Sequence, residues 1–579
     1  MYGCPACGAG LRFDIASQKL HCDYCDNSYD PAEYDREKNA AERRDGYLDV
    51  TVYTCTQCGA EMVSTDNAVT GFCSYCGASA VLSSRLDSQP RPKKIIPFLK
   101  TKENCKEQYV KKTRYAIYAP KELRDSQFLE RFRGIYIPYW LYRVTFKENA
   151  SVPGRKVYRK GNYEYSEEYT INLDLKGGYR DLAYDASVSF NDRLADTIAP
   201  FSHKKMKPFR SGYLCGFYAD MADVDKETYI KEAKESATDY ALRSLEQKLL
   251  KTDVTVSLPD SEAAKEALVG TSCEDADGGL FPVWFLTWRR KDRVAYSVVN
   301  GETGRVFADL PVDLGRFFIG SAITAVILYI LAEWFLFMMP PTALSAAALM
   351  ALIAAAAFYR ASDKITSQDI HADDKGFWSD VSPEDPGFQE YEKYKKKEKD
   401  NSGFLARAGR FALKFIENGL LPVLAVMFLS MNVLGTVFSM IGRLTIGFGA
   451  TTSTEAVETA MSACTGTAIL GTWYFIRTIL LCRRVIRVQQ IHPGRAALTE
   501  QHRNMIIGAA FAYAAQIVAL VTVMLHPAND MIYYVASIIC LLAVAATCVG
   551  LIQRYNLMAT HPVPDFFDRK GGNDSAQDV

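Results

Sequence analysis

Hydrophobic and polar residues divide the chain into two parts that meet near Arg316. Before that residue the apolar positions follow short strand and helix patterns, and beyond it long apolar runs dominate. The second of these runs, at about 342–359, is the shortest, and its stretch from Ala346 to Ala357 is only weakly hydrophobic. Each run is close to the roughly 20 residues that cross the hydrocarbon core of a bilayer. We therefore predict six membrane-spanning helices, at about 317–339, 342–359, 419–441, 461–482, 505–525 and 531–552.

The segment from about residue 95 to 314 alternates β-type runs with helical stretches, which is typical of an α+β domain. Strands are predicted at Ile135–Thr145, at Tyr165–Leu175 and within a hairpin from Val283 to Phe307. In that hairpin, Asn300 and Gly301 are residues that tolerate positive φ at a chain reversal, and Gly304 follows at the loop exit. Asp225 is predicted to cap a helix whose apolar face comprises Tyr229, Ile230, Ala233, Ala237, Tyr240, Ala241, Leu245 and Leu249.

These patterns predict a multidomain protein with two small zinc ribbons, an α+β cytosolic domain and an all-α polytopic membrane domain. The charged stretch after residue 30 is expected to be a short helix or a linker, and a proline-rich stretch near residue 90 marks a boundary. The expected parts are zinc ribbon 1 (1–30), a linker (31–50), zinc ribbon 2 (51–84), the α+β cytosolic domain (95–314), a transmembrane hairpin (317–359), a charged cytosolic loop (360–414), four transmembrane helices (415–552) and a cytosolic tail (553–579).

Lysine and arginine in the connections predict the orientation, because basic residues are retained on the cytoplasmic side. The loop 360–414 carries eleven, the loop 483–504 carries five and the tail after residue 551 carries three, whereas the opposite side has only Arg443. With an even number of spans, both termini are predicted to lie in the cytosol, in a multi-pass protein of the cell membrane.

Cysteines are concentrated at the N-terminus, where eight of the 15 form four Cys-x-x-Cys pairs. The pairs combine into two units with 14 residues between the pairs of each unit, and the second unit repeats the first at an offset of 51 residues. Tetrahedral zinc needs four ligands, and each pair supplies two thiolates from one tight turn. We predict two structural Zn²⁺ sites, one at Cys4, Cys7, Cys22 and Cys25 and one at Cys55, Cys58, Cys73 and Cys76.

The residue after each pair supports this prediction. Gly8, Gly59 and Gly77 occupy that position in three pairs and Asp26 in the fourth, and these residue types tolerate the left-handed turn that directs backbone amides toward sulfur. A redox dithiol pair and an iron–sulfur cluster are the alternatives. Reduced thiols and the lack of a signal-peptide pattern agree with a cytosolic location.

Charge disfavours nucleic acid as a partner of the ribbons. The chain as a whole balances 67 basic against 67 acidic residues. Residues 1–30 contain only Arg12 and Lys19 as basic residues, and residues 51–80 contain none, although phosphate contact requires them. We therefore expect the partners to be the lipid bilayer and cytosolic proteins, while the oligomeric state stays open.

Catalytic patterns are missing from the sequence. It has no Gly-x-Ser-x-Gly, no phosphate-binding loop ending in Gly-Lys-Ser/Thr and no His-Glu-x-x-His, so we expect no enzyme and no catalytic residue. Within the predicted spans, Asn432 and Gln516 are expected to bind neighbouring helices, and Gly508 with Ala512 suits close helix packing. Arg477 is expected to snorkel to the cytosolic interface.

Three motifs carry a resemblance to a known group of proteins. They are the Cys-Pro-x-Cys-Gly opening at Cys4, the strand Gly134–Tyr142, and the Asn300–Val306 hairpin followed by Leu310-Pro311. Over about residues 1–314 the chain resembles bacterial membrane proteins with transcription factor IIB-type zinc ribbons, sometimes mislabelled as replication-restart helicases. The resemblance implies a cytosolic zinc-ribbon head tied to the membrane, with no established activity and, in some members, a link to phage-shock-type envelope stress. Asp26 departs from the glycine of that pattern.

The sequence thus leads to three functional hypotheses. The first is a membrane-anchored zinc-ribbon adaptor or scaffold that binds cytosolic proteins, with envelope stress as the setting that the resemblance suggests. The second is a transporter or channel with a zinc-ribbon regulatory head, which requires a polar cavity joining Asn432, Gln516 and Arg477. The third is a membrane-tethered nucleic-acid-binding protein.

Overall fold

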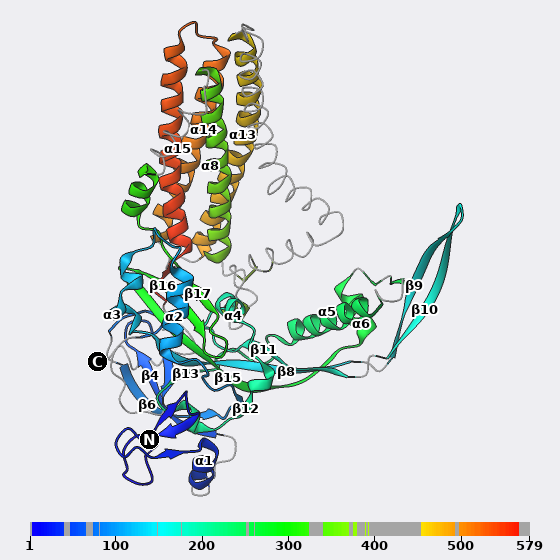
Figure 1. The fold of residues 1–579 in the computed structure, drawn as a ribbon, viewed down its shortest axis with the longest axis vertical. Helices are drawn as coiled ribbons and strands as arrows, with labels where there is room; N and C mark the ends of the chain where they lie inside the picture. Colours follow the sequence, from blue (N-terminus) through cyan, green and yellow to red (C-terminus); the bar gives the residue numbers. More distant parts are fainter. Residues whose placement is uncertain are drawn as a thin grey trace, which may run out of the picture.

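A computed structural model shows an elongated molecule with a helical bundle at one end, a β-rich body at the other and a thin arm projecting from the body (Figure 1). It describes residues 3–39, 47–64, 73–79, 82–146, 149–174, 177–249, 254–256, 258–259, 261–323, 340–369, 375–378, 388–389, 392, 453–491, 497–564 and 566.

The first cysteine unit forms a small three-stranded sheet of β1 (Arg12–Asp14), β2 (Lys19–His21) and β3 (Ser28–Tyr29). Helix α1 (Pro31–Asn39) follows at once, and the Asp30 carboxylate caps it by accepting from the Ala32 amide at 2.8 Å. The predicted short helix is therefore present up to Asn39, and residues 40–46 lie outside the described part. The unit packs on the body through Phe13, whose ring meets that of Tyr213 edge-on at 5.2 Å.

The body is built on a 12-stranded sheet whose main path runs β12-β7-β15-β8-β13-β5-β4-β6 among the described residues. β11 pairs with β8, and β16 pairs with β15, β17 and β18. The strands are β4 (Tyr47–Cys55), β5 (Glu61–Ser64), β6 (Leu82–Pro90), β7 (Lys94–Ile95), β8 (Arg133–Thr145), β11 (Gly178–Asp185), β12 (Lys207–Pro208), β13 (Tyr218–Asp220), β15 (Ser272–Arg290), β16 (Arg293–Asn300), β17 (Val306–Ala308) and β18 (His561–Pro562).

The second cysteine unit belongs to this sheet. Its strand β5 pairs antiparallel with β13, where Val63 faces Ala219, and β13 in turn pairs with β8. The strands of residues 51–84 thus continue the sheet of the α+β domain instead of forming a layer of their own.

Both faces of the sheet are covered, so strand β8 is buried along most of its length. Successive residues point to opposite faces. Tyr136 enters one core cluster, which also holds Tyr109 of helix α2 (Lys102–Thr113). Ile135 and Ile137 enter a second cluster under helix α4 (Asp192–Ile198).

The strand predictions agree with β8 and with β10 (Tyr163–Asp174). The Val283–Phe307 region contains two reversals, and Asn300-Gly301 makes the second, between β16 and β17. The expected positive φ occurs at Gly304 (+78°) and at neither Asn300 nor Gly301. Gly301 is required for a different reason, because a Cβ there would lie 2.7 Å from the Phe98 ring.

Helix α5 (Ile230–Leu249) begins later than predicted. Residues 226–229 form a turn after Asp225, and the Thr228 amide donates to the Asp225 carbonyl oxygen at 3.0 Å. The predicted buried face is present at Tyr229, Ala233 and Ala237, but Tyr240 is half-exposed.

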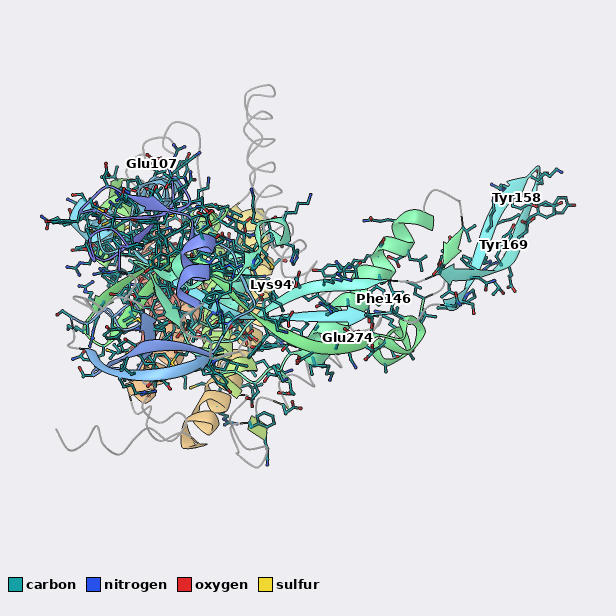
Figure 2. All side chains as sticks on the ribbon, turned by 90° about the horizontal axis from the view of Figure 1, so that it is seen from below. Lys94, Glu107, Phe146, Tyr158, Tyr169 and Glu274 are labelled. Atoms are coloured by element: carbon teal, nitrogen blue, oxygen red, sulfur yellow. The ribbon has the colours of Figure 1, made fainter. Side chains whose placement is uncertain are left out.

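A long hairpin forms the projecting arm, which consists of β9 (Asn149–Lys160) and β10 with the short strand β14 (Thr255–Val256) on β9 (Figures 1 and 2). Helix α6 (Glu262–Val269) lies near its base. The two long strands pair in register from Asn149–Asp174 to Lys160–Tyr163.

Four helices of the described residues are long and apolar enough to cross a membrane. They are α8 (Pro340–Asp369), α13 (Ser453–Ile491), α14 (Ala497–Met524) and α15 (Asp530–Met558), and they form one bundle (Figure 1). The predicted spans at 342–359, 461–482 and 531–552 fall within α8, α13 and α15, and the predicted span at 505–525 ends one residue beyond α14. Of the predicted span 317–339 only the part up to Ile323 is described, as an apolar helix from Leu314, and the span 419–441 lies outside the described residues.

Candidate metal centres

Four tight turns of one geometry present the eight cysteines. In each turn the first cysteine amide donates to the carbonyl oxygen five residues on, and its own carbonyl accepts from the amide four residues on, over 2.6–2.9 Å. The residue that follows the second cysteine has φ between +62° and +76° at Gly8, Asp26, Gly59 and Gly77. The predicted left-handed position is therefore confirmed in all four turns, including the one where aspartate replaces glycine.

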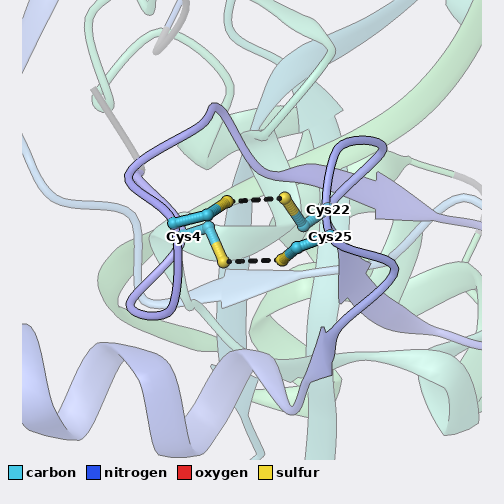
Figure 3. Close-up of side chains that lie close together, drawn as sticks. Cys4, Cys22 and Cys25 are labelled. Atoms are coloured by element: carbon cyan, nitrogen blue, oxygen red, sulfur yellow. Dashed lines mark hydrogen bonds between the residues drawn. The ribbon is translucent and has the colours of Figure 1, made fainter.

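The first centre brings together Cys4, Cys7, Cys22 and Cys25 (Figure 3). The Sγ atoms of Cys4 and Cys25 lie 3.5 Å apart, as do those of Cys7 and Cys22. A tetrahedron with zinc–sulfur bonds of about 2.3 Å has sulfur–sulfur edges of about 3.8 Å. The four thiols are thus arranged to hold one ion of that size.

The surroundings of the first centre are partly open. Cys4 and Cys22 are buried, whereas Cys7 is exposed. The Tyr29 hydroxyl lies 3.4 Å from Cys4 Sγ, and this contact lowers the pKa of Cys4 to about 6. A lowered pKa favours the thiolate, which is the form that binds metal.

The second centre brings together Cys55, Cys58, Cys73 and Cys76, and all four are buried. The Sγ atoms of Cys55 and Cys76 lie 3.8 Å apart, and those of Cys58 and Cys73 lie 3.7 Å apart. Contacts with the other three thiols lower the pKa of Cys55. The edge lengths match the zinc tetrahedron, and the four cysteines leave no ligand position for water.

The body of the protein holds the second centre through the residues beside its ligands. Tyr75 lies between Cys73 and Cys76, and its hydroxyl donates to Asp220 Oδ2 at 2.5 Å. The Tyr296 hydroxyl donates to the Tyr75 carbonyl oxygen at 3.0 Å. These contacts fasten one cysteine turn to strands β13 and β16.

Asp220 is fully enclosed with this tyrosine. Burial raises its pKa to about 7, and the nearby Asp223 carboxylate adds to the effect, while hydrogen bonds from Ser187 and Tyr75 oppose it. Burial likewise raises the pKa of Tyr75. The second centre is thus embedded in a buried polar network, which sequence spacing gave no means of predicting.

The segment after the last membrane helix also reaches the second centre. Strand β18 adds to the sheet beside β16, where Val294 faces His561, and the His561 ring stacks on that of Tyr296 at 5.4 Å. Phe566 then donates its amide to the Cys58 carbonyl oxygen at 2.8 Å. Residues 559–564 and 566 therefore lie on the same side of the helical bundle as both cysteine centres.

Hydrogen bonds fix the last membrane helix to the body. The Arg293 guanidinium donates to the carbonyl oxygen of Leu557 at 2.9 Å and to the hydroxyl of Thr560 at 2.6 Å. Asn556 exchanges two hydrogen bonds with the backbone of Val312, at 2.6 and 2.8 Å. The bundle and the body are thus joined at defined positions, and no pattern in the sequence predicts these contacts.

Of the polar residues predicted within the spans, Gln516 contacts neighbouring helices as expected, whereas the snorkelling of Arg477 to the cytosolic interface stays a prediction. Gln516 is fully buried. In the side-chain orientation that satisfies both its polar atoms, Nε2 donates to the Thr467 carbonyl oxygen and Oε1 accepts from the Leu352 backbone amide, each at 3.2 Å. It therefore joins helices α14, α13 and α8. Arg477 lies over the ring of Trp473 at 4.6 Å. Asn432 lies outside the described residues.

The predicted small-residue face packs closely. A Cβ on Gly508 would lie 2.6 Å from the Phe358 ring of helix α8, and Ala512 is fully buried. The expectation of close helix packing at this face is confirmed.

Comparison with known proteins gives a distant relative. No family model matches the chain, and no solved structure matches it. The chain is 25% identical over 319 residues to the uncharacterized protein YdjG of Bacillus subtilis (strain 168), and the match covers 54% of this chain and 91% of that protein. The two cysteine clusters are consistent with tandem zinc ribbons, and the relative's name attaches no activity to them.

Proposed function

We propose that the chain is a membrane-anchored zinc-ribbon adaptor that binds cytosolic proteins at the membrane. In this proposal the two cysteine centres hold structural Zn²⁺, and the chain carries no enzymatic activity. The proposal places both termini in the cytoplasm. Two observations support this placement: residues 559–564 and 566 lie on the same side of the bundle as both centres, and the lysines and arginines of the connections are concentrated on that predicted side.

The observation that carries the proposal is the arm of β9 and β10, which projects from the body with most of the β9 side chains exposed (Figure 2). Four of its tyrosines are exposed: Tyr158, Tyr163, Tyr165 and Tyr169. Tyrosine is enriched at protein interfaces, where it supplies a large contact area with two rotatable angles. These rings belong to none of the buried core clusters of the described residues, which favours a binding role.

The arm is also preorganised. The rings of Tyr158 and Tyr165 stack at 5.6 Å across the two strands, and the Tyr158 hydroxyl donates to Glu167 at 2.8 Å. Rings that are already held in place lose little conformational freedom when a partner binds.

Charge supports protein over nucleic acid as the partner of the first ribbon. The first ribbon exposes Tyr24 beside acidic residues, and it contains only Arg12 and Lys19 as basic residues. The transporter alternative gains no support from Gln516, which is packed between three helices. A role in envelope stress rests on the family resemblance alone and is the least supported part of the proposal.

Co-purification of the full-length protein from native membranes tests the proposal. We compare Tyr163→Ser/Tyr165→Ser on the arm with Tyr47→Ser/Tyr115→Ser on the body, since all four tyrosines are exposed. The adaptor proposal expects a protein that co-purifies with the wild type and the body variant but is depleted about tenfold with the arm variant, as loss of interface hot spots produces. Equal recovery of every protein by both variants contradicts it.

A further inference from the structure

A cavity of about 560 Å³ lies in the cytosolic domain, between helix α4, the start of helix α5 and strand β11 (Figure 1). Its size is that of small-molecule sites in proteins. Its lining includes two basic side chains, Lys375 and His203, and four carboxylates, Asp185, Asp192, Asp196 and Glu232. The excess of negative charge favours a cation as the ligand.

Aromatic rings form one wall of this cavity. Tyr184 and Tyr229 stack at 5.2 Å with an angle of 14° between their planes. Hydrogen bonds fix both rings, because the Tyr229 hydroxyl donates to Asp192 Oδ1 at 2.8 Å and the Tyr184 hydroxyl lies 2.8 Å from Ser236 Oγ. Aromatic faces attract organic ammonium ions, whereas Ca²⁺ and Mg²⁺ require a shell of oxygen ligands.

The chain itself already places an ammonium group at this wall. Lys375, from the short helix α9 (Lys375–Trp378), directs its Nζ to Glu232 Oε2 at 2.6 Å and lies 5.6 Å from the centre of the Tyr229 ring. Its Nζ also donates to the Thr228 carbonyl oxygen, and its amide donates to Asp192 Oδ2 at 2.9 Å. This part of the cavity therefore recognises an alkylammonium group.

A second polar group lies deeper in the cavity. Tyr139 is only 5% exposed, and its hydroxyl has no hydrogen-bond partner within the described part of the chain. Its ring is held by stacking on Phe281 at 4.4 Å. Burial raises the pKa of its hydroxyl, and the nearby carboxylates of Asp185, Asp196 and Asp192 add to the effect. A buried hydroxyl without a partner is costly, and a ligand that supplies one removes that cost.

We propose that this cavity binds a linear aliphatic diamine. One ammonium group takes the place of Lys375 Nζ between Glu232 and the Tyr229 ring, and the other reaches Asp196 and donates to the Tyr139 hydroxyl oxygen. Lys375 is then an internal occupant that the ligand displaces. Because Lys375 follows the end of helix α8 at Asp369 by six positions, displacement releases a segment directly connected to a membrane helix.

Calorimetric titration of the full-length protein in lipid nanodiscs with 1,5-diaminopentane tests this proposal. We expect saturable binding of one diamine per chain to the wild type. Lys375→Met removes the internal ammonium while keeping its aliphatic stem, so it binds the diamine about tenfold more tightly, the effect of one charged hydrogen bond. Glu232→Gln weakens binding by about the same factor. Lys204→Met, which removes a nearby exposed lysine outside the lining, leaves the affinity unchanged.

Three outcomes would overturn the proposal. They are no saturable heat with either the wild type or Lys375→Met, equal affinity in Glu232→Gln and the wild type, and equal binding of the neutral 1,5-pentanediol. If Lys375→Met does not fold, diamine affinity is compared among the wild type, Glu232→Gln and Tyr139→Phe. Tyr139→Phe removes only the hydroxyl, so we expect it to weaken diamine binding. Equal affinity of Tyr139→Phe and the wild type contradicts the placement of the second ammonium group.

Discussion

The amide of Phe566 donates to the carbonyl oxygen of Cys58 at 2.8 Å, so the chain that leaves the last membrane helix ends its described course on the second metal centre. The Phe566 ring also meets the ring of Tyr75 edge-on at 6.0 Å. A cysteine turn is thus covered by a segment that follows directly on helix α15. The second centre and the membrane anchor are parts of one packed unit.

Phe566→Ala tests this connection. The side chain is half-buried, so we expect the free energy of unfolding to fall by about 1–2 kcal/mol, less than the 3–5 kcal/mol of a fully buried phenylalanine. The amides of residues 55–60 should exchange with deuterium faster in the variant, because their cover is loosened. Phe566→Leu is the control, since it keeps most of the apolar contact. Unchanged exchange in Phe566→Ala contradicts a packing role for this ring.

The two metal centres are expected to differ in how much of the fold depends on them. Cys58 is fully buried in the main sheet, whereas Cys7 is exposed at the edge of the small ribbon. The apparent free energy of binding a structural zinc ion is about 10–16 kcal/mol, and it adds to the free energy of folding. This is comparable to the unfolding free energy of a whole domain, about 5–15 kcal/mol. Cys58→Ser should therefore unfold the β-rich body, and Cys7→Ser should leave it folded with about one zinc per chain.

Zinc analysis by mass spectrometry and thermal unfolding of the full-length protein separate these outcomes. Cys273→Ser is the matched control, because that cysteine belongs to neither centre, and it should keep about two zinc ions per chain. Equal melting temperatures for Cys7→Ser and Cys58→Ser would show that the centres are equivalent. Iron in place of zinc would favour the cluster alternative.

The raised pKa of Asp220 leads us to expect that the stability of the folded chain depends on pH. Its pKa in the folded chain is about 7, raised from the ordinary 3.8 chiefly by burial. Between these values the folded chain holds a proton that the unfolded chain has released, so this group makes stability fall as pH rises toward 7. From pH 5.5 to 7 the loss is about 2 kcal/mol.

Asp220→Asn should remove that part of the pH dependence. Urea unfolding at several pH values measures the free energy of unfolding of both proteins. As pH rises toward 7, the wild type should lose stability relative to Asp220→Asn. Asp125→Asn, at an exposed aspartate, should follow the wild type. Parallel curves for Asp220→Asn and the wild type would contradict an ionisable group at this buried position.

Two glycines in the membrane helices form a matched pair. A Cβ on Gly508 would lie 2.6 Å from the Phe358 ring, whereas a Cβ on Gly466 meets nothing within 4 Å. Gly508→Ala should destabilise the bundle by about 1–3 kcal/mol through overpacking, and Gly466→Ala should be neutral or slightly stabilising. Unfolding in detergent compares them. Equal stabilities would show that helices α8 and α14 do not approach as closely as described.

Local patterns could be predicted from the sequence because their causes are local. The cysteine turns follow from ligand spacing and from residues that tolerate positive φ, so even Asp26 (φ +62°) was assigned correctly. Apolar runs likewise located the four described membrane helices. The 342–359 run, weakly hydrophobic as it is, lies in a 30-residue helix because neighbouring helices pack on its alanines.

Long-range relationships could not be predicted in this way. The joining of β5 to β13 and of β18 to β16 depends on which strands meet in space, and a single sequence carries no record of that. Gly301 looked like a turn residue by type, but the Phe98 ring above it is what excludes a side chain. The cavity of Asp192, Glu232 and Lys375 was missed for the same reason, since its members are ordinary charged residues in the sequence.

Site-specific photo-crosslinking from the arm tests the adaptor proposal most directly. A photoreactive phenylalanine analogue replaces Tyr163 on the arm, and in a second protein it replaces Tyr115 on the body, because both side chains are more than 70% exposed. Irradiation of native membranes should yield a discrete protein adduct from position 163 that is absent from position 115. No protein adduct from position 163, or the same adducts from both positions, would contradict the proposal that this arm binds a cytosolic protein.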